Sequence, residues 1–301
     1  MKITLISTLL NEGNGADFLM QSVFNQTRKP DEIVVVDGGS TDNTVERLKG
    51  WKTKFKSKGV AMRILKAEGA NIAQGRNLAV KQARHEWIAS IDGGCIAEKD
   101  WLEKMEAKAR ATQADVVSGN FRPLAKTFAE KLQGVFVRIS AKDNPSSRSI
   151  MFRKKFWKRA GGYPENLYTG EDTKFNSAMK AKGAKFVFAP GAVVNWRMRP
   201  SLKKWFKQFY LYGYGDGKAR IRPDTAYGKK VWTLVAGFYL FVALALAYPI
   251  ILIAPFFGGV LYGLKRKFAL EGFVAGLLYP FRLLAFLIGL HRGLLAKRQN
   301  A

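Results

Sequence analysis

The stretch EIVVVDGGS, residues 32–40, decides the fold of the amino-terminal part of this chain. Residues 32–36 are almost continuously apolar and β-branched, which is typical of a parallel strand covered on both faces. The strand runs directly into Asp37 and the turn-forming residues that follow it. The stretch therefore predicts a buried strand with a polar carboxyl end.

Similar apolar runs alternate with helical patterns on both sides of this strand. The other predicted strands are KITLIST (2–8), AMRILKA (61–67) and WIASIDGG (87–94). The predicted helices are DFLMQSVFNQT (17–27), DNTVERLKGW (42–51), NIAQGRNLAVKQAR (71–84) and KDWLEKMEAKARAT (99–112). This alternation predicts right-handed crossovers and a Rossmann-like, doubly wound α/β fold with a mostly parallel sheet. The ligand of such a fold lies beyond the carboxyl ends of the strands.

The composition narrows the class of protein further. The 301 residues include 50 Lys and Arg against 23 Asp and Glu, and a single cysteine, Cys95. One cysteine excludes an intrachain disulfide scaffold, and 48% hydrophobic residues argue against a disordered chain. The net charge of +27 indicates a polyanionic partner, which is nucleic acid, an anionic membrane surface or a phosphate-rich substrate.

Residues 231–264 form 34 consecutive positions without a charged side chain. One straight helix of this length would be about 50 Å long, whereas a hydrocarbon core is roughly 30 Å thick. Because Pro249 lies near the centre of the run, we expect a transmembrane hairpin of two spans, 231–248 and 250–264.

The charges on both sides of this run predict its orientation. Residues 197–230 form a basic collar of ten Lys and Arg against two Asp, and Lys265–Lys267 follow the run. Two crossings would leave both basic clusters on the cytoplasmic side of the cell membrane, together with a catalytic domain at residues 1–222. We expect residues 265–301, which are divided by Pro280, to form interfacial or membrane-associated helices.

Acidic residues follow the predicted strands. Asp37 either faces the ligand crevice beyond the carboxyl ends of the strands, as a hydrogen-bond acceptor for a nucleotide, or serves as a turn residue. The sequence leaves both roles open. Asp92 ends a buried strand, where a free carboxylate is costly without a compensating cation. Glu171 and Asp172 stand where a loop enters a helix, and because both cannot cap that helix, one is available as a general base.

Several motifs in the same order resemble family 2 glycosyltransferases. They are VDGGSTDNT (36–44), GRNLAV (75–80), IDGGC (91–95), SSRSIMFRK (146–154), GGYPENLYTGEDTKF (161–175) and NWRMRPSLKKWFKQFYLYGYGDGKA (195–219). The resemblance covers residues 1–222 and implies an inverting enzyme of GT-A fold that uses a nucleotide-diphosphate sugar. It is more specific for the membrane-anchored subgroup, which acts on lipid-linked or polysaccharide acceptors.

The resemblance also implies roles for individual residues. Asp172 would be the catalytic base, with Glu171 supporting the acceptor. The residues implied in donor binding are Thr8, Asn11, Glu12, Asp37, Arg76 and Asp92. The residues expected at the acceptor are Ser147, Arg148, Trp196, Arg197 and Gln208.

One motif departs from the family pattern. The usual metal motif is Asp-x-Asp, but this chain has Asp92, Gly93 and Gly94, so the second carboxylate is missing. Asp92 alone would hold a Mg or Mn ion whose other ligands are water and diphosphate oxygens, or basic residues would take over part of the metal's role.

The sequence therefore predicts an enzyme that transfers a sugar from a nucleotide-diphosphate sugar to a membrane-associated acceptor. This acceptor would be a lipid-linked saccharide, a polyprenyl phosphate or a growing polysaccharide. The alternatives are a catalytically inactive membrane scaffold of the same fold and, less well supported, a nucleic-acid-binding protein. The uncharged run and the acidic strand ends argue against nucleic acid as the partner.

Overall fold

The computed structural model describes residues 1–137, 145–167, 169–199, 201–220, 226–248, 253–254, 257–258, 260–261 and 269–296. Contacts divide the chain into two compact units. The first unit comprises Met1–Arg122 and Arg138–Arg197, and the second comprises Pro123–Val137 and Met198–Ala301. Each unit has hydrophobic clusters of its own.

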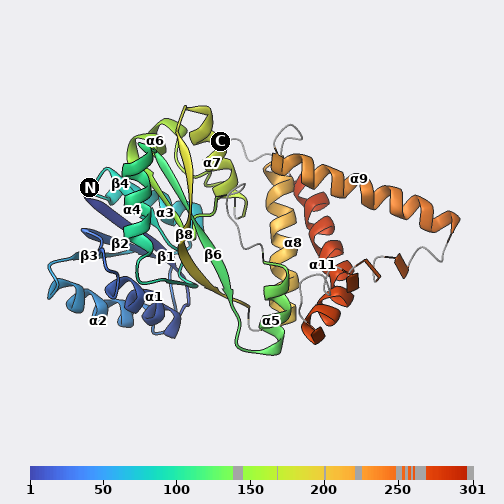
Figure 1. The fold of residues 1–301 in the computed structure, drawn as a ribbon, viewed down its shortest axis with the longest axis horizontal. Helices are drawn as coiled ribbons and strands as arrows, with labels where there is room; N and C mark the ends of the chain where they lie inside the picture. Colours follow the sequence, from blue (N-terminus) through green and yellow to red (C-terminus); the bar gives the residue numbers. More distant parts are fainter. Residues whose placement is uncertain are drawn as a thin grey trace. The chain divides into compact units, whose positions relative to one another are not determined.

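The first unit contains the sheet and the helices that cover it (Figure 1). Its strands are β1 (Ile3–Leu9), β2 (Glu32–Asp37), β3 (Ala61–Lys66), β4 (Trp87–Ser90), β5 (Cys95–Ala97), β6 (Val116–Leu124), β7 (Ile150–Arg153) and β8 (Phe186–Arg197). Its helices are α1 (Asn14–Phe24), α2 (Thr44–Lys56), α3 (Ile72–Gln82), α4 (Trp101–Thr112), α6 (Lys154–Ala160) and α7 (Glu171–Ala181).

The strands form one sheet in the order β3-β2-β1-β4-β7-β6-β8-β5. The four strands predicted from the sequence pair in parallel, β3 with β2, β2 with β1 and β1 with β4. Beyond β4, antiparallel pairs join β7 to β4, β7 to β6 and β5 to β8. The sheet is therefore mixed, and only its parallel half follows the simple alternation of the sequence.

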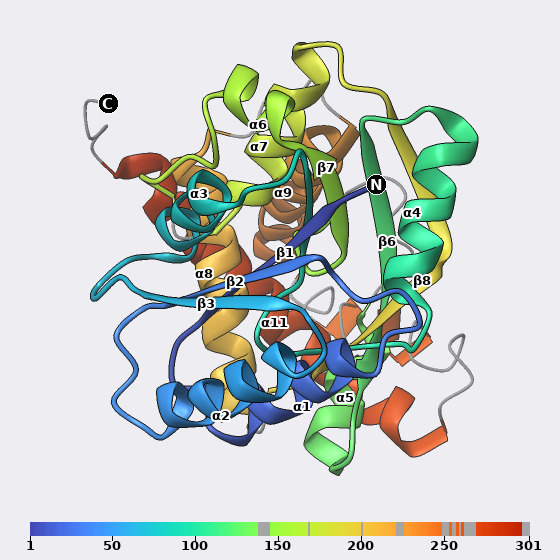
Figure 2. The same cartoon turned by 90° about the vertical axis from the view of Figure 1, so that its left-hand side faces the viewer.

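Alternate residues of β2 enter two different cores. Ile33 and Val35 belong to one cluster, and Val34 and Val36 to another. Because successive side chains of a strand point to opposite faces, the run of valines requires a layer of helices on each side of the sheet. Figure 2 shows α1 and α2 on one side of these strands and α3 on the other.

The second unit consists of helices. They are α5 (Phe128–Val135), α8 (Leu202–Lys218), α9 (Ala226–Ala247) and α11 (Ala269–Leu295). Glycines let α8 and α11 pack with their backbones in close contact, since a Cβ at Gly213 would overlap the carbonyl oxygen of Phe286. Likewise, a Cβ at Gly289 of α11 would overlap the carbonyl oxygen of Tyr210 of α8. Small residues four positions apart allow this kind of packing between membrane helices.

Two helices of this unit are long and apolar enough to span a membrane, over Gly228–Ala247 and Phe273–Leu295. Only 11% and 28% of the most apolar 18-residue windows of these two segments are buried within the structure. The first segment coincides with the first expected span. The expected second span, 250–264, falls mainly outside the described residues.

The region expected to be divided at Pro280 is one continuous helix, α11. A proline removes one backbone hydrogen bond without always ending a helix. Three polar residues of this helix have partners within the second unit. Glu271 lies 3.5 Å from Lys131, and His291 Nε2 lies 2.6 Å from the Tyr239 hydroxyl. The Arg282 guanidinium lies over the ring of Phe136 at 4.4 Å and over two further rings.

Alanine substitutions at two glycines should distinguish the effect of helix packing on stability from the effect of helix propensity. Gly213→Ala should lower the free energy of unfolding, because the overlap with α11 costs about 1–3 kcal/mol and exceeds the gain in propensity of about 1 kcal/mol. Gly237→Ala, on α9, meets no atom within 4 Å and should be neutral or stabilising. Thermal unfolding in lipid nanodiscs measures both variants. Equal stability of the two would contradict close packing of α8 and α11.

Candidate active site

The parallel half of the sheet gathers polar residues at one edge. Leu9 of β1 pairs with Asp37 of β2, and β4 lies on the other side of β1. The loops that leave these strands carry Asn11, Glu12 and Asp92. Because parallel strands end at the same edge, residues distant in sequence lie close together there.

Arg76 occupies the centre of this edge. It extends from α3, is 2% exposed, and donates hydrogen bonds to two carboxylates at once. Its Nη2 lies 2.7 Å from Oδ1 of Asp92, and its Nη1 lies 2.6 Å from Oε1 of Glu171. Burial alone would lower the pKa of Arg76, but Asp92 and Glu171 raise it, so the guanidinium stays charged. Arg76 thus connects the loop after β4 with the beginning of α7.

Glu171 and Asp172 begin α7 in different surroundings. Glu171 is 6% exposed, and burial, followed by the neighbouring Asp172, raises its pKa to about 7 even though Arg76 opposes the shift. Asp172 is half-buried and accepts hydrogen bonds from the Thr173 amide at 2.8 Å and the Ser146 hydroxyl at 3.5 Å. Glu171 therefore holds a proton more readily than an ordinary carboxyl group does, and Asp172 is more accessible than Glu171.

The turn at residues 146–149 lies against the same group of residues. The Arg148 guanidinium stacks over Trp196, 4.0 Å from the ring, and its Nε lies 3.9 Å from Oδ2 of Asp92. The Ser147 hydroxyl lies 3.2 Å from the hydroxyl of Tyr163. The structure therefore brings two expected acceptor residues, Arg148 and Trp196, close to the expected donor residue Asp92.

Asp37 and Asn11 hold the loops after β2 and β1. Asp37 is 1% exposed and accepts hydrogen bonds from the amides of Gly39 and Ser40 at 3.0 Å, and from the Ser40 hydroxyl at 2.5 Å. Asn11, at a φ of 52°, accepts from the Thr41 amide at 2.9 Å. These hydrogen bonds are those expected of a turn residue, and the role of Asp37 as a hydrogen-bond acceptor for a nucleotide stays a prediction.

Thr8 and Glu12 lie against glycines that leave room for their side chains. A Cβ on Gly75 would lie 2.8 Å from Cγ2 of Thr8, so Gly75 allows α3 to approach β1. A Cβ on Gly93 would lie 3.0 Å from Oε1 of Glu12. The Glu12 carboxylate is therefore next to the loop that carries Asp92.

The remaining expected acceptor residues are Arg197 and Gln208. Arg197 lies beside Glu12, because a Cβ on Gly15 would lie 2.8 Å from both Arg197 Nη1 and Glu12 Oε2. Arg197 is exposed at the end of β8, with its guanidinium over the ring of Phe18 at 5.4 Å. Gln208 belongs to α8 in the second unit, where its Nε2 donates to the Tyr212 hydroxyl.

The sequence analysis did not identify Asn77 and Tyr163 as residues of this site. The Asn77 side chain accepts from the Tyr163 amide and donates to the Tyr163 carbonyl, both at 2.8 Å. It thereby places the Tyr163 ring 5.4 Å from the Arg76 guanidinium. Burial raises the pKa of the Tyr163 hydroxyl, which keeps it protonated. Asn77 and Tyr163 belong to the motifs GRN and GGY, which the sequence analysis identified. The sequence does not show that these two motifs, 86 positions apart, are in contact.

The carboxylates at this edge suit a hard cation only in part. Among the residues that the structure describes, no group of three or more His, Cys, Asp and Glu side chains is arranged to hold a metal. Glu12 lies beside the loop that carries Asp92, and Mg²⁺ is commonly held by one or two carboxylates together with substrate phosphates. The residues therefore fit a cation whose remaining ligands come from a bound diphosphate.

A family model described as Glycosyl transferase family 2 matches residues 4–168, more than half of the chain. The chain is 25% identical over 248 residues to glycosyltransferase AglE of Haloferax volcanii, covering 77% of this chain and 80% of that protein. Other curated relatives match over about 120 residues, which is 32% and 38% of the length of two of them.

A further relative is an enzyme of Methanococcus voltae. It is named dolichyl N-acetyl-alpha-D-glucosaminyl phosphate 3-beta-D-2,3-diacetamido-2,3-dideoxy-beta-D-glucuronosyltransferase. It is 23% identical over 264 residues, covering 81% of this chain and 80% of that enzyme.

The fold is similar to that of a solved structure, the mannosyltransferase PcManGT from Pyrobaculum calidifontis in complex with GDP-Man and Mn2+. The TM-score is 0.61 at 19% identity, and the match covers 98% of this chain and 87% of that chain. At this identity the likeness establishes the fold alone.

The pKa of Glu171 predicts how stability depends on pH. Its folded value of about 7 exceeds the ordinary 4.5, so between these values the folded chain binds more protons than the unfolded chain. The contribution of Glu171 to stability is therefore present below pH 4.5 and is lost as the pH rises toward 7. Glu171→Gln should remove this dependence.

Thermal unfolding of the wild type and Glu171→Gln from pH 4.5 to 8 measures the effect. The stability of the wild type relative to the variant should decrease across the window. Glu46→Gln, at an exposed carboxylate on α2, provides the control. Parallel curves for the wild type and Glu171→Gln would show that the pKa of Glu171 is not raised.

Proposed function

This chain belongs to glycosyl transferase family 2 and is a glycosyltransferase of GT-A fold, and we propose that it extends a lipid-linked saccharide by one sugar. The donor would be a nucleotide-diphosphate sugar, and the acceptor a hydroxyl group on the saccharide. The observation that carries this proposal is the Arg76 contact, because it joins the Asp92 loop to the Glu171–Asp172 pair.

Three features support this donor and this acceptor. The polar edge of the parallel strands is the place where a fold of this kind binds a nucleotide. The apolar helices α9 and α11 favour an acceptor that lies in a membrane. The name of the Methanococcus voltae relative describes a dolichyl phosphate saccharide as its substrate, and this relative matches four fifths of the chain. Transfer to a polyprenyl phosphate or to a growing polysaccharide would use the same site.

In the proposed reaction, Asp172 accepts the proton of the acceptor hydroxyl. The oxygen then forms a bond with the anomeric carbon while the bond from this carbon to the diphosphate breaks. Since this is a single displacement, the configuration at the anomeric carbon is inverted. Asp172 suits the role of base because it is half-buried at a helix start, where free amides stabilise its charged form.

Glu171 and Arg76 would position Asp172. Arg76 holds Glu171 at 2.6 Å, which fixes the first turn of α7 and hence the backbone of Asp172. The pKa of Glu171, about 7, lets this carboxyl group share a proton with its surroundings near neutral pH, so it does not add a second full negative charge beside the base.

Arg148 and Asp92 would act on the departing diphosphate. Arg148 stacks on Trp196 and carries a fixed positive charge near Asp92. A divalent cation held by Asp92 and Glu12 would supply further charge neutralisation at the diphosphate. Stabilisation of developing charge by positioned groups is commonly the largest contribution to such catalysis.

The decisive experiment for this function is the substitution Asp172→Asn. Because removal of a general base commonly costs 10²–10⁴-fold in rate, sugar transfer should fall by about this factor while binding of the nucleotide sugar is retained. A panel of nucleotide sugars incubated with membranes that contain the protein identifies the donor, and release of the nucleoside diphosphate gives the rate.

The matched control is Asp100→Asn, which removes a partly exposed carboxylate at the start of α4. Unchanged transfer by Asp172→Asn would reject the base, and no turnover of any donor by the wild type would favour a catalytically inactive scaffold. A Mn²⁺ titration of nucleoside diphosphate binding tests the cation: binding should tighten in the wild type and not in Asp92→Asn.

A further inference from the structure

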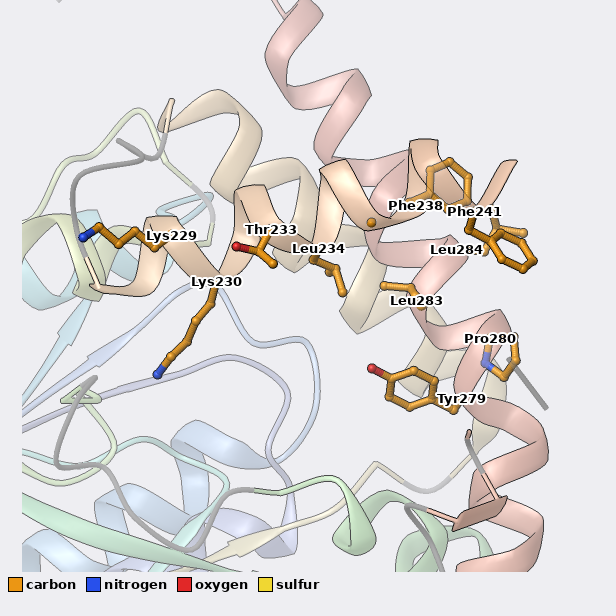
Figure 3. A pocket seen from close by; sticks show the side chains of 11 residues that line it. Lys229, Lys230, Thr233, Leu234, Phe238, Phe241, Tyr279, Pro280, Leu283 and Leu284 are labelled. Atoms are coloured by element: carbon orange, nitrogen blue, oxygen red, sulfur yellow. The ribbon is translucent and has the colours of Figure 1, made fainter. Parts of the chain in front are cut away.

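A groove of about 600 Å³ lies between α9 and α11 in the second unit. Figure 3 shows Lys229 and Lys230 at one end of it, and Phe238 and Phe241 at the other. The two helices are in contact through a small apolar cluster, whose buried members are Val231, Val235, Leu287 and Leu290. Farther along α9 the apolar side chains are exposed, as at Leu240 and Leu246.

The lining of this groove is almost entirely apolar, and Lys229 and Lys230 stand at one end with their ammonium groups directed away from the apolar side chains (Figure 3). Both lysines are exposed at the mouth, whereas Leu234 of α9 and Leu283 of α11 line its middle. Gly237 also lines it, and the position of a Cβ there is open space. Two exposed lysines at the end of an apolar groove are complementary to a ligand with an anionic head and a long hydrocarbon chain.

The depth of the groove corresponds to one leaflet of a membrane. Lys230 and Phe241 are eleven positions apart on α9, which is about 16 Å at 1.5 Å per residue. Half of a hydrocarbon core is roughly 15 Å. If the lysines lie at the level of the headgroups, the apolar part of the groove therefore ends near the middle of the bilayer.

We propose that this groove binds a lipid phosphate with one long hydrocarbon chain, the carrier of the saccharide acceptor, with its phosphate at Lys229 and Lys230. The inference rests on the proposed function, because that function requires a lipid-linked acceptor. It adds the part of this chain that recognises the carrier.

Recognition of the chain distinguishes this site from ordinary attraction to the membrane. Exposed lysines beside a membrane attract any anionic headgroup. A groove between two helices adds contacts with one hydrocarbon chain, so a single-chain lipid phosphate should bind more tightly than a phospholipid with two chains. Both the phosphate and the chain are therefore necessary for binding.

Photolabelling tests the site. The full-length protein in phosphatidylcholine nanodiscs is exposed to a polyprenyl phosphate that carries a diazirine on its first isoprene units, and the labelled peptides are identified by mass spectrometry. We expect label on α9 and α11. Unlabelled polyprenyl phosphate should compete, whereas polyprenol, which lacks the phosphate, and phosphatidylglycerol, which has two chains, should not.

Two kinds of variant have matched controls. Gly237→Trp fills the groove and should reduce labelling at least tenfold, whereas Leu240→Trp adds the same ring on an exposed part of the same helix and should not. Lys229→Gln with Lys230→Gln should reduce labelling by a similar factor. The control replaces two exposed lysines of α8, Lys203→Gln with Lys204→Gln. It removes the same charge and should leave labelling unchanged. The lysine pair is exposed, so its replacement leaves folding intact.

Three results would overturn the inference. They are equal labelling of Gly237→Trp and Leu240→Trp, label placed outside α9 and α11, and competition by phosphatidylglycerol equal to that by polyprenyl phosphate. Release of nucleoside diphosphate by the wild type is measured in parallel. Its absence with every donor would reject the proposed function, whereas its presence together with any of the three results would reject the groove alone.

Discussion

The ion pairs of Arg76 are the interaction on which the rest of the site depends. One buried guanidinium holds Asp92 at 2.7 Å and Glu171 at 2.6 Å, and these residues belong to segments separated by 79 positions in the chain. Loss of one member of a buried ion pair leaves an uncompensated charge and commonly costs 3–5 kcal/mol. The same guanidinium lies beside Tyr163, which Asn77 holds in place from the next position on α3. Arg76 therefore fixes the loop after β4, the loop before α7 and the first turn of α7 together.

Much of the parallel half of the fold could be predicted from the sequence. The valines of β2 specify a strand buried on both faces, and the turn residues after it specify where the strand ends. Asp92, Arg76, Glu171 and Asp172 were each identified as candidates, and the structure brings them together. Their contacts could not be predicted, because no local pattern records that α3 lies against the beginning of α7. The antiparallel pairing of β5 with β8 is likewise a contact between distant segments.

The carboxyl-terminal helices show a second limit of sequence reasoning. Pro280 was expected to divide the carboxyl-terminal region, but it lies inside one helix, α11, in which aromatic rings from α8, α11 and the end of α5 surround the Arg282 guanidinium. Glycines bring α8 and α11 into backbone contact, which no local pattern in the sequence records. In contrast, the uncharged first half of the run at residues 231–264 did predict α9. Composition thus indicates which segments are apolar, whereas the pairing of polar groups decides whether they form continuous helices.

The most direct test of the role of Arg76 is a double-mutant cycle on sugar transfer with Arg76→Met and Glu171→Met. If the two residues act through their contact, the losses in kcat/KM will not add, and the coupling energy will be at least about 1.4 kcal/mol, a tenfold effect. The double variant will then be more active than the product of the single effects. Losses that add to within about 0.5 kcal/mol would show that Arg76 and Glu171 act independently, which would contradict this account of the site.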